Sequence, residues 1–310
     1  MMNKGHSSAY QHRDEHSGKH LEPAQLGTLS YSGIFNRLNS SRDTICKFGV
    51  CVEVVCDKGD IYLQHITTNP TEVKIGQSIV DALRQVPSSE RSNYVALDVG
   101  MSQGYFTLLP AALGFETHAF EPQPACVALV LAALEGQPGL AENVYIHNVA
   151  LGDRADGESL QLHVGMCQMM YAGGVNDEGR SWNKERGTRV RVPVKRLDGY
   201  LGERRAAVVK IDVEGAEVLV LEGLVESVQA MRVNMLIIEV SRSQWQLHGV
   251  SDERGAEVFL RLFKAASRVV HLEQDKVMED FESFLRTAGY EQSNMLFAYG
   301  QQSVASHQHI

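Results

Sequence analysis

The stretch LDVGMSQGYF, residues 97–106, decides the fold class. An apolar run ends at Asp98, glycines follow at positions 100 and 104, and a helical pattern begins after the second glycine. Glycine lets a ligand approach the backbone, and a helix start offers unpaired N–H groups. The G-x-x-x-G spacing differs from the G-x-G-x-x-G of dinucleotide-binding loops. Because Asp98 would repel a pyrophosphate, the loop favours a ligand with a positively charged amino group.

Outward from this loop, strand and helix patterns alternate. Apolar runs typical of strands lie at 94–98, 116–120, 143–147, 206–211, 234–239, 268–272 and 295–299, and helical patterns lie at 104–113, 123–134, 216–224 and 252–264. Repeated β-α-β units predict an α/β fold with a mostly parallel sheet covered by helices on both faces. Ligands of such sheets bind beyond the carboxyl ends of the strands. Residues 158–164 and 188–194 predict a hairpin that carries a long polar loop.

Acidic side chains stand at the ends of these runs. Glu121, 23 residues after Asp98, can accept hydrogen bonds from a ribose diol, or it can cap the helix that begins near Pro122. Asp212 and Glu239 end two nearly continuous apolar runs. An acid buried at the end of a central strand is costly unless it is paired or functional. Helix capping is the alternative for Asp212 and for the acids that follow it.

Two further features can border a ligand at the strand ends. Asn148 and the backbone of Val149 and Ala150 follow the third run and can read an adenine edge, although asparagine there is most often a turn residue. Both tryptophans, Trp182 and Trp245, lie in loops expected over the strand ends. They predict either an aromatic wall for a ligand or ordinary loop packing.

Taken in order, six motifs make the chain resemble the FkbM family of S-adenosylmethionine-dependent methyltransferases. They are LDVGMSQGYFTL, AFEPQP, NVALGD, VPVKRLDGYL, VKIDVEGAEVLVLEGL and LIIEV, within about residues 60–299. The resemblance implies the class I methyltransferase fold, which is Rossmann-like and seven-stranded, here with a β-rich N-terminal elaboration. It also implies S-adenosylmethionine as cofactor and a hydroxyl oxygen as methyl acceptor. The family loop is closer to DVGANIGYF, so Met101, Ser102 and Gln103 depart from it.

The resemblance also implies which residues form the site. The cofactor-binding residues would be Asp98, Gly100, Gly104 and Tyr105 around the methionine portion, Glu121 at the ribose, Asn148, Val149 and Ala150 at the adenine, and Asp212 at the methionine amine. A base need only accept a proton as the new bond forms. The candidate bases are, in order, Asp212, Glu214, Glu239 and His248. No metal site is expected: His12, His16 and His20 would align only on a helix that their surroundings disfavour.

The net charge of the chain limits the classes of partner that it is expected to bind. The formal charge is −9, whereas a nucleic-acid-binding domain usually presents a basic face. We therefore expect a small-molecule or glycan acceptor and no nucleic acid. No apolar run reaches the roughly 18 residues of a membrane span, and no secretory signal is visible, so the expected location is cytoplasmic. The alternatives are a catalytically inactive cofactor-binding or scaffold protein, an NAD-linked oxidoreductase and an RNA methyltransferase.

The expected organisation has four parts. Residues 1–44 are a disordered tail, 45–90 an N-terminal elaboration, 91–300 the methyltransferase domain and 301–310 a frayed end. The elaboration holds a hairpin that turns at Asp57-Lys58-Gly59-Asp60, followed by a helix over 72–86. The cysteines are expected to be buried thiols in a reducing compartment, and a cluster of Cys46, Cys51 and Cys56 is the alternative.

Overall fold

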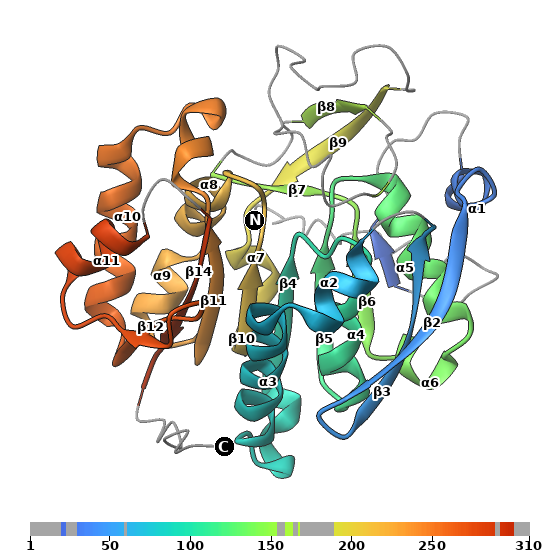
Figure 1. The fold of residues 1–310 in the computed structure, drawn as a ribbon, viewed down its shortest axis with the longest axis horizontal. Coiled ribbons are helices and arrows are strands. Elements are labelled where there is room, and N and C mark those ends of the chain that lie inside the picture. Colours follow the sequence, from blue (N-terminus) through green and yellow to red (C-terminus); the bar gives the residue numbers. More distant parts are fainter. Residues whose placement is uncertain are drawn as a thin grey trace, which may run out of the picture.

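A nine-stranded sheet organises the molecule (Figure 1). The computed structural model describes residues 20–22, 30–58, 61–153, 159–163, 167, 189–288 and 292–300. The strand order is β1-β6-β5-β4-β10-β11-β14-β12-β13. These strands are β1 (His20–Glu22), β4 (Tyr94–Val99), β5 (Glu116–Phe120), β6 (Val144–His147), β10 (Arg205–Ile211), β11 (Met235–Val240), β12 (Arg268–His271), β13 (Lys276–Val277) and β14 (Ser293–Ala298).

The direction and order of the strands agree with the fold that the family resemblance implies. From β1 to β11 the neighbouring strands run parallel, whereas β14 is antiparallel to both β11 and β12. The chain passes from β4 to β5 and β6 on one side, and then to β10 and β11 on the other side of β4. The seven-stranded Rossmann-like sheet expected from the sequence is therefore present, and β1 and β13 extend its two edges.

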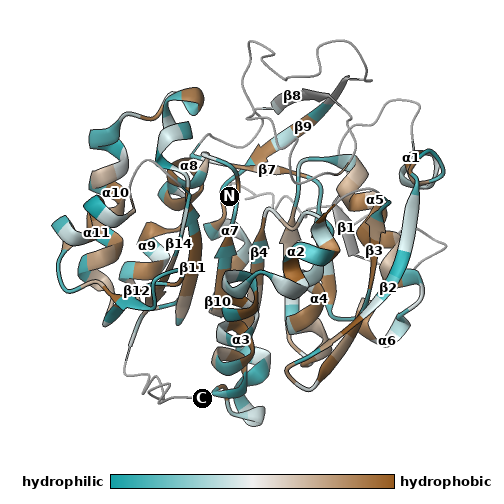
Figure 2. Cartoon of the chain, viewed as in Figure 1, coloured by the Kyte–Doolittle hydropathy of each residue, from teal (hydrophilic) through white to brown (hydrophobic). Residues whose placement is uncertain are grey.

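Helices cover both faces of the sheet. The helical segments are α1 (Tyr31–Phe35), α2 (Tyr62–Thr68), α3 (Pro70–Arg84), η1 (Ser88–Asn93), α4 (Tyr105–Ala112), α5 (Pro124–Glu135), α6 (Pro138–Ala141), α7 (Asp198–Leu201), α8 (Glu217–Glu222), α9 (Val225–Gln229), η3 (Arg242–His248), α10 (Asp252–Ala265) and α11 (Phe281–Thr287). Alternate residues of β4 enter different cores: Ala96 packs with α3, α4 and α5, whereas Val95 and Leu97 pack with α8 to α11. Figure 2 shows the resulting pattern, hydrophobic central strands and more hydrophilic outer helix faces.

The N-terminal region differs from the expectation. The hairpin consists of β2 (Ser40–Lys47) and β3 (Val50–Asp57), and it turns at Phe48 and Gly49, not at residues 57–60. Both turn residues have a positive φ, as two-residue hairpin turns require. The run after Asp57 forms helix α2, because Tyr62 and Ile66, one turn apart, are both buried.

The expected disordered tail is also wrong in its second half. α1 and most of β2 lie within residues 30–44, and Ile34 is only 4% exposed. Further upstream in the sequence, the short strand β1 pairs with β6. His12 and His16 lie outside the described residues. The boundary expected after residue 44 therefore falls inside a strand, and the hairpin, α1, α2 and α3 pack on the sheet face of α4 and α5 (Figure 1).

The cysteines correct a further expectation. Cys46 and Cys51 face each other across the hairpin with Cα atoms 4.1 Å apart and form a disulfide. Cys126 and Cys167, with Cα atoms 4.8 Å apart, form a second one, and Cys56 keeps a buried thiol. The prediction of thiols throughout is wrong because it placed Cys46 and Cys51 on one strand. Disulfides persist in oxidising compartments, so they do not favour the reducing, cytoplasmic location.

A three-stranded sheet lies beside the main one (Figure 1). It contains β7 (Ala150–Leu151), β8 (Ser159–His163) and β9 (Arg189–Lys195), and β8 and β9 form the expected antiparallel hairpin. Most of the loop between them lies outside the described residues. Ser251 caps α10 by accepting a hydrogen bond from the Arg254 N–H at 3.2 Å. Among the described helices, none has the length and hydrophobicity for crossing a membrane.

Candidate functional site

The candidate site lies along the carboxyl edge of the sheet, where β4 separates two groups of strands. Parallel sheets bind ligands at such a switch in strand order. The predicted residues come to this edge from five strand ends: Asp98, Gly100, Gly104 and Tyr105 at β4, Glu121 at β5, Asn148, Val149 and Ala150 at β6, Asp212 and Glu214 at β10, and Glu239 at β11.

Gly100 and Gly104 are required by the packing of the loop after β4. Their φ angles are +83° and +90°. A Cβ on Gly100 would lie 1.8 Å from the carbonyl oxygen of Asp212, and a Cβ on Gly104 would lie 2.6 Å from Val130. The Asp212 N–H donates to the Val99 carbonyl at 2.9 Å, which ties the loops after β4 and β10 together. Gly100 therefore lets these two loops come into close contact, and Gly104 lets Val130 of α5 pack against the loop, whether or not a ligand is bound.

Asp98 and Tyr105 flank the glycine loop and are both about 2% exposed. Asp98 Oδ2 accepts a hydrogen bond from Thr107 Oγ1 at 2.6 Å. Asp98 Oδ1 and the Tyr105 hydroxyl are buried and have no hydrogen-bond partner among the described residues. Burial raises the pKa of Asp98, and the positive charge of Lys210 opposes that rise. Both atoms retain hydrogen-bonding capacity that a ligand group or a water can use.

Glu121 connects the loops after β4 and β5. Its two carboxylate oxygens accept hydrogen bonds from the backbone N–H of Ser102 at 3.1 Å and of Gln123 at 2.9 Å. Burial raises the pKa of Glu121 to about 7. Gln123 directly precedes α5, so Glu121 bonds the residue before that helix, and among the described residues no side chain caps the first turn of α5. The ribose role of Glu121 stays a prediction.

Asn148 organises the turn after β6. Its Oδ1 accepts from the Tyr31 hydroxyl at 3.0 Å, and its Nδ2 donates to the Glu121 carbonyl at 2.6 Å. Both ends of this fully buried amide are thus bonded within the protein. A purine edge would then be bordered by the backbone of Val149 and Ala150. Tyr31 belongs to α1, in a region where the sequence analysis expected no structure.

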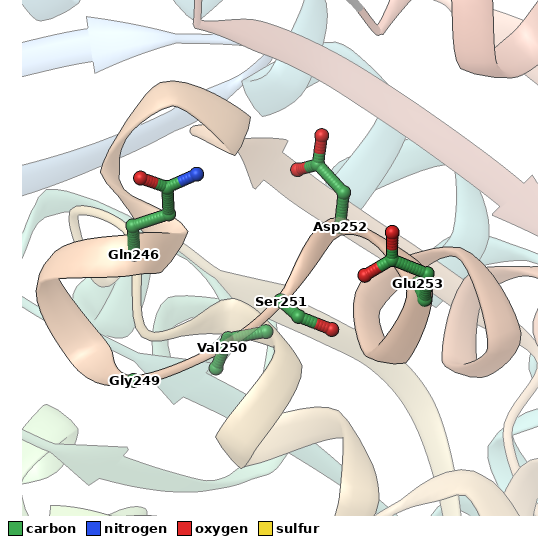
Figure 3. Close-up of a pocket in the computed structure, with 6 residues that line it drawn as sticks. All are labelled: Gln246, Gly249, Val250, Ser251, Asp252 and Glu253. Carbon is green, nitrogen blue, oxygen red and sulfur yellow. The ribbon is translucent and has the colours of Figure 1, made fainter.

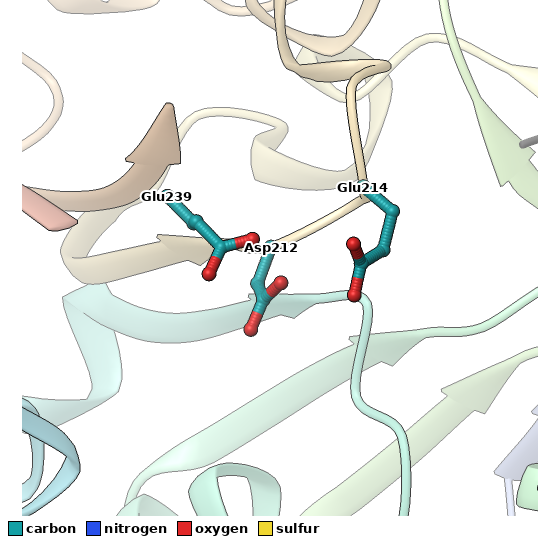
Figure 4. A group of neighbouring side chains, drawn as sticks. All are labelled: Asp212, Glu214 and Glu239. Atoms are coloured by element: carbon teal, nitrogen blue, oxygen red, sulfur yellow. The ribbon is translucent and has the colours of Figure 1, made fainter. Parts of the chain in front are cut away.

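Asp212, Glu214 and Glu239 form the acidic trio of the site. One carboxylate oxygen from each residue lies within 4.8 Å of those from the other two, and Figure 4 shows Asp212 between Glu214 and Glu239. Burial, and then repulsion from Asp212, raises the pKa of Glu214 to about 7 and that of Glu239 to about 10. Carboxyl groups this close share protons instead of all ionising. They also offer oxygen ligands of the kind that divalent cations take, so the absence of a metal stays a prediction.

His248, the remaining candidate base, lies beside the trio. Its Nε2 is 3.1 Å from the carbonyl oxygen of Glu214. Burial lowers the pKa of His248. Glu214 itself has a left-handed backbone with φ +53°. Non-glycine residues held in this conformation concentrate at functional sites.

Lys210 is a site residue that the sequence analysis missed. Its side chain is 7% exposed, and Nζ donates to Asp212 Oδ2 at 3.0 Å. Burial by itself lowers the pKa of Lys210. The carboxylates of Asp212, Asp98 and Glu72 outweigh burial and raise that pKa, so the ammonium stays charged. Glu72, from α3, lies 3.3 Å from His65 Nε2. A lysine inside an apolar strand run gives little signal in a sequence.

Trp245 and Glu217 are structural. Trp245 is 1% exposed and stacks on Phe259 with ring centres 5.7 Å apart. Glu217 accepts hydrogen bonds from the Gly215 N–H at 2.7 Å and from Trp245 Nε1 at 3.2 Å. Of the two sequence interpretations, packing is therefore correct for Trp245. Trp182 lies outside the described residues.

A separate open pocket of about 420 Å³ lies between η3 and α10 (Figure 3). Its lining residues are Gln246, Gly249, Val250, Ser251, Asp252 and Glu253. No residue that the sequence placed in the cofactor site or among the bases lines it. The pocket is therefore distinct from the acidic trio and the glycine loop.

Comparison with known proteins identifies the family. The model of the methyltransferase FkbM domain matches residues 98–291, which begin at the end of β4 and include the acidic trio. The chain belongs to this family. The FkbM methyltransferase has the class I methyltransferase fold, and the family implies S-adenosylmethionine as methyl donor. No curated protein matches the sequence.

Solved structures with a similar fold are distant. The bifunctional kinase-methyltransferase WbdD is 14% identical with a TM-score of 0.35, over 78% of this chain and 42% of WbdD. A putative SAM-dependent methyltransferase from Streptococcus mutans is 12% identical with a TM-score of 0.38, over 83% of this chain and 55% of that one. A human methyltransferase 10 domain containing protein is 11% identical with a TM-score of 0.32, over 75% and 83%. The chain thus spans about half or less of the first two proteins, and none of the three bears on its substrate.

The residues of this FkbM methyltransferase fit a cationic sulfonium cofactor. Asp98 and Tyr105 each present a buried polar atom with hydrogen-bonding capacity to spare beside the glycine loop. Three further acids lie at the next strand ends, and Lys210 forms an ion pair with one of them, Asp212. An amino group and a positively charged sulfur are groups that such acids stabilise.

Proposed function

We propose that the protein transfers the methyl group of S-adenosylmethionine to a hydroxyl oxygen of a small molecule or sugar. The observation that carries the proposal is the position of the acidic trio, with carboxylate oxygens within 4.8 Å of one another, directly beside the glycine loop. A hydroxyl group must lose its proton as its oxygen forms a bond to carbon. Acids at this position can accept that proton while the glycine loop holds the cofactor.

The cofactor end of the proposal uses the loops after β4, β5 and β6. When bound, S-adenosylmethionine supplies a methyl group that its positive sulfur already activates. Asp98 and Tyr105 bind the methionine portion, Glu121 accepts from the ribose, and the turn at Asn148 borders the adenine. The protein therefore acts mainly by positioning donor and acceptor, which can account for a large part of a rate.

The acceptor end of the proposal uses the acidic trio. Asp212 is held by Lys210 at 3.0 Å, so its carboxylate has a fixed direction. Glu214, with a pKa raised to about 7 chiefly by burial, is poised to take up a proton near neutral pH. Glu239, with a pKa of about 10, is protonated at that pH and can donate a hydrogen bond to Asp212 or to an acceptor oxygen. Asp212 and Glu214 are thus the proposed bases. Glu239, in its protonated form, is the proposed hydrogen-bond donor beside them.

The acceptor class follows from charge and chemistry. The acidic trio and Asp98, with Lys210 as their cationic neighbour, disfavour an anionic acceptor such as a nucleic-acid backbone. Neutral hydroxylated molecules, including glycans, carry no such penalty. We therefore place a small molecule or sugar ahead of RNA as the methyl acceptor.

The test begins with the cofactor and continues to the product. Calorimetry with S-adenosylmethionine and with S-adenosylhomocysteine should show binding of both, and thermal shifts with NAD should show none. Incubation with methyl-labelled cofactor and fractionated cell extract, followed by mass spectrometry, should place the label on a hydroxyl oxygen. Binding without any labelled product supports the inactive scaffold, and label on nitrogen or carbon overturns the acceptor assignment. No heat with either cofactor form overturns the function as a whole.

A further inference from the structure

Residues before the family match contact two loops of the cofactor site. The match begins at residue 98, yet α1, β3 and α2 all lie upstream of it. These elements reach the turn after β6 and the carboxyl-terminal end of the glycine loop through hydrogen bonds of 3.0–3.2 Å. In Figure 1, α2 and the hairpin lie on the same side of the sheet as α4 and α5.

Tyr62 of α2 caps the helix that follows the glycine loop. The first N–H groups of a helix have no partner within it, and a side chain normally bonds one of them. Gly104, which occupies the N-cap position of α4, has no side chain to do so. The Tyr62 hydroxyl instead accepts a hydrogen bond from the Tyr105 N–H at 3.1 Å. Tyr62 and Tyr105 are both buried, so this contact is shielded from water.

Gln103 ties the glycine loop to the hairpin. It is fully buried, and its Oε1 accepts from the backbone N–H of Asp57 at 3.2 Å. Its Nε2 donates at 3.2 Å to the carbonyl of Cys167, which is linked by a disulfide to Cys126 in α5. Gln103 is one of the three residues that depart from the usual family loop. Its side chain is therefore matched to partners that lie outside that loop.

Tyr31 of α1 holds the turn at the opposite, nucleoside end. Its hydroxyl donates to Asn148 Oδ1 at 3.0 Å, and Asn148 donates onward to the Glu121 carbonyl at 2.6 Å. Two consecutive hydrogen bonds thus join α1 to the residue proposed for the ribose. α1 packs against α5, and Ile34 anchors it in the core at 4% exposure.

We propose that Tyr31 and Tyr62 are positioning residues of the cofactor site, Tyr31 for the adenosine end and Tyr62 for the methionine end. This inference rests on the proposed function, because it assigns ends to the same cofactor. Neither hydroxyl needs to touch the ligand: each holds a backbone segment in the shape that the ligand meets. The region from α1 to α2 is then part of the binding site and not an attachment to a complete domain.

The experiment compares two ligands of different length in the full chain. S-adenosylhomocysteine has the amino acid portion, and 5′-methylthioadenosine lacks it. Tyr31→Phe should weaken binding of both ligands to a similar extent, about three- to tenfold, the effect of one hydrogen bond. Tyr62→Phe should weaken S-adenosylhomocysteine by a similar factor and leave 5′-methylthioadenosine nearly unchanged. Calorimetry gives the four dissociation constants.

Tyr94→Phe is the matched control, because Tyr94 begins β4 at the opposite end of the strand, where its ring faces Arg205. It should change neither affinity. Hydrogen exchange gives an independent readout, since the Tyr105 amide should exchange faster in Tyr62→Phe. If Tyr62→Phe does not fold, Gln103→Leu alters the same loop in its place. It should likewise weaken binding of S-adenosylhomocysteine and leave that of 5′-methylthioadenosine nearly unchanged.

The outcomes separate the two proposals. Normal binding by the unaltered protein, together with unchanged affinities in Tyr31→Phe and Tyr62→Phe, overturns the positioning roles and leaves the proposed function intact. Equal losses for both ligands in both variants overturn the assignment of ends. An unaltered protein that binds neither ligand overturns the proposed function and this inference with it.

Discussion

The two halves of the carboxyl edge differ in how their polar and acidic groups are bonded. On the side of β5 and β6, the polar groups of Glu121 and Asn148 are bonded to neighbouring loops. On the side of β10 and β11, three carboxyl groups crowd within 4.8 Å, and Lys210 forms an ion pair with one of them. The first half has the order of a preformed binding surface. The second half stores unfavourable charge, which a cationic ligand or a shared proton relieves.

From this comparison we expect the residues that set cofactor affinity and those that set reactivity to lie on different strands. Changes on the β5 and β6 side should alter how tightly the cofactor binds. Changes on the β10 and β11 side should alter proton transfer and the response to pH. The following variants test this division, starting with the largest expected effect.

Asp212→Asn should lower turnover about 100-fold or more, because the amide cannot accept the proton of the acceptor. Affinity for S-adenosylhomocysteine should stay within about threefold of the unaltered protein. Single-turnover kinetics and calorimetry measure the two quantities. Asp252→Asn is a matched control, since Asp252 is 38% exposed and pairs with Arg242, much as Asp212 is 37% exposed and pairs with Lys210. Equal losses of turnover and affinity would make Asp212 a structural acid.

Glu121→Ala should weaken S-adenosylhomocysteine binding by about tenfold or more, since it removes a hydrogen-bonding carboxylate from the ribose position. Turnover at saturating cofactor should change much less. Titration calorimetry and saturation kinetics separate these effects, and Glu121→Gln should give a smaller loss because it keeps one acceptor oxygen. An unchanged affinity in Glu121→Ala would contradict the ribose assignment.

Stability of the ligand-free protein should fall as pH rises from about 5 to 9. Burial raises the pKa of Glu121, Glu214 and Glu217 to about 7 and that of Glu239 to about 10. Since these values exceed those of the unfolded chain, these four carboxyl groups bind more protons in the folded state than in the unfolded state throughout this range, which outweighs the opposite effect of the single His248. The free energy of unfolding therefore decreases with increasing pH.

Glu239→Gln should remove the upper part of that decrease. At pH 9 we expect its melting temperature to exceed that of the unaltered protein by a few degrees, with little difference at pH 5. Glu253→Gln, on the exposed first turn of α10, serves as control. A variant that melts lower than the unaltered protein at pH 9 would show that the Glu239 carboxylate is stabilised in the fold.

The smallest expected effect is that of metal removal. At neutral pH the trio retains protons, as the pKa of about 10 for Glu239 indicates, and this disfavours a divalent cation. Methyl transfer should therefore be unchanged after treatment with a chelator. If the chelator abolishes turnover and magnesium restores it, the trio is a metal site. Metal binding, and not proton sharing, would then explain how the three carboxyl groups tolerate one another.

The sequence predicted what local patterns determine. The strand that ends at Asp98, the two glycines and the acidic ends of β10 and β11 all follow from short-range periodicity and residue type. The prediction of a turn at residues 57–60 failed because Asp-Lys-Gly-Asp is a favourable turn sequence. Burial of Tyr62 and Ile66 instead favoured a helix after it.

The rest depends on contacts that no local pattern encodes. Tyr31 and Asn148 are 117 residues apart in the sequence, and Tyr62 meets Tyr105 across 43 residues. Lys210 is a single polar residue in an apolar strand, so only its neighbours Asp98, Asp212 and Glu72 reveal its role. The Cys46–Cys51 disulfide likewise required knowledge of which strands pair.

The disulfide between Cys126 and Cys167 has a practical consequence at the bench. It fastens the carbonyl group to which Gln103 donates, and so it lies one hydrogen bond from the glycine loop. A sample purified with dithiothreitol and one purified in air are therefore different molecules at this point. The oxidation state of each preparation has to be assayed before affinities from separate batches are compared.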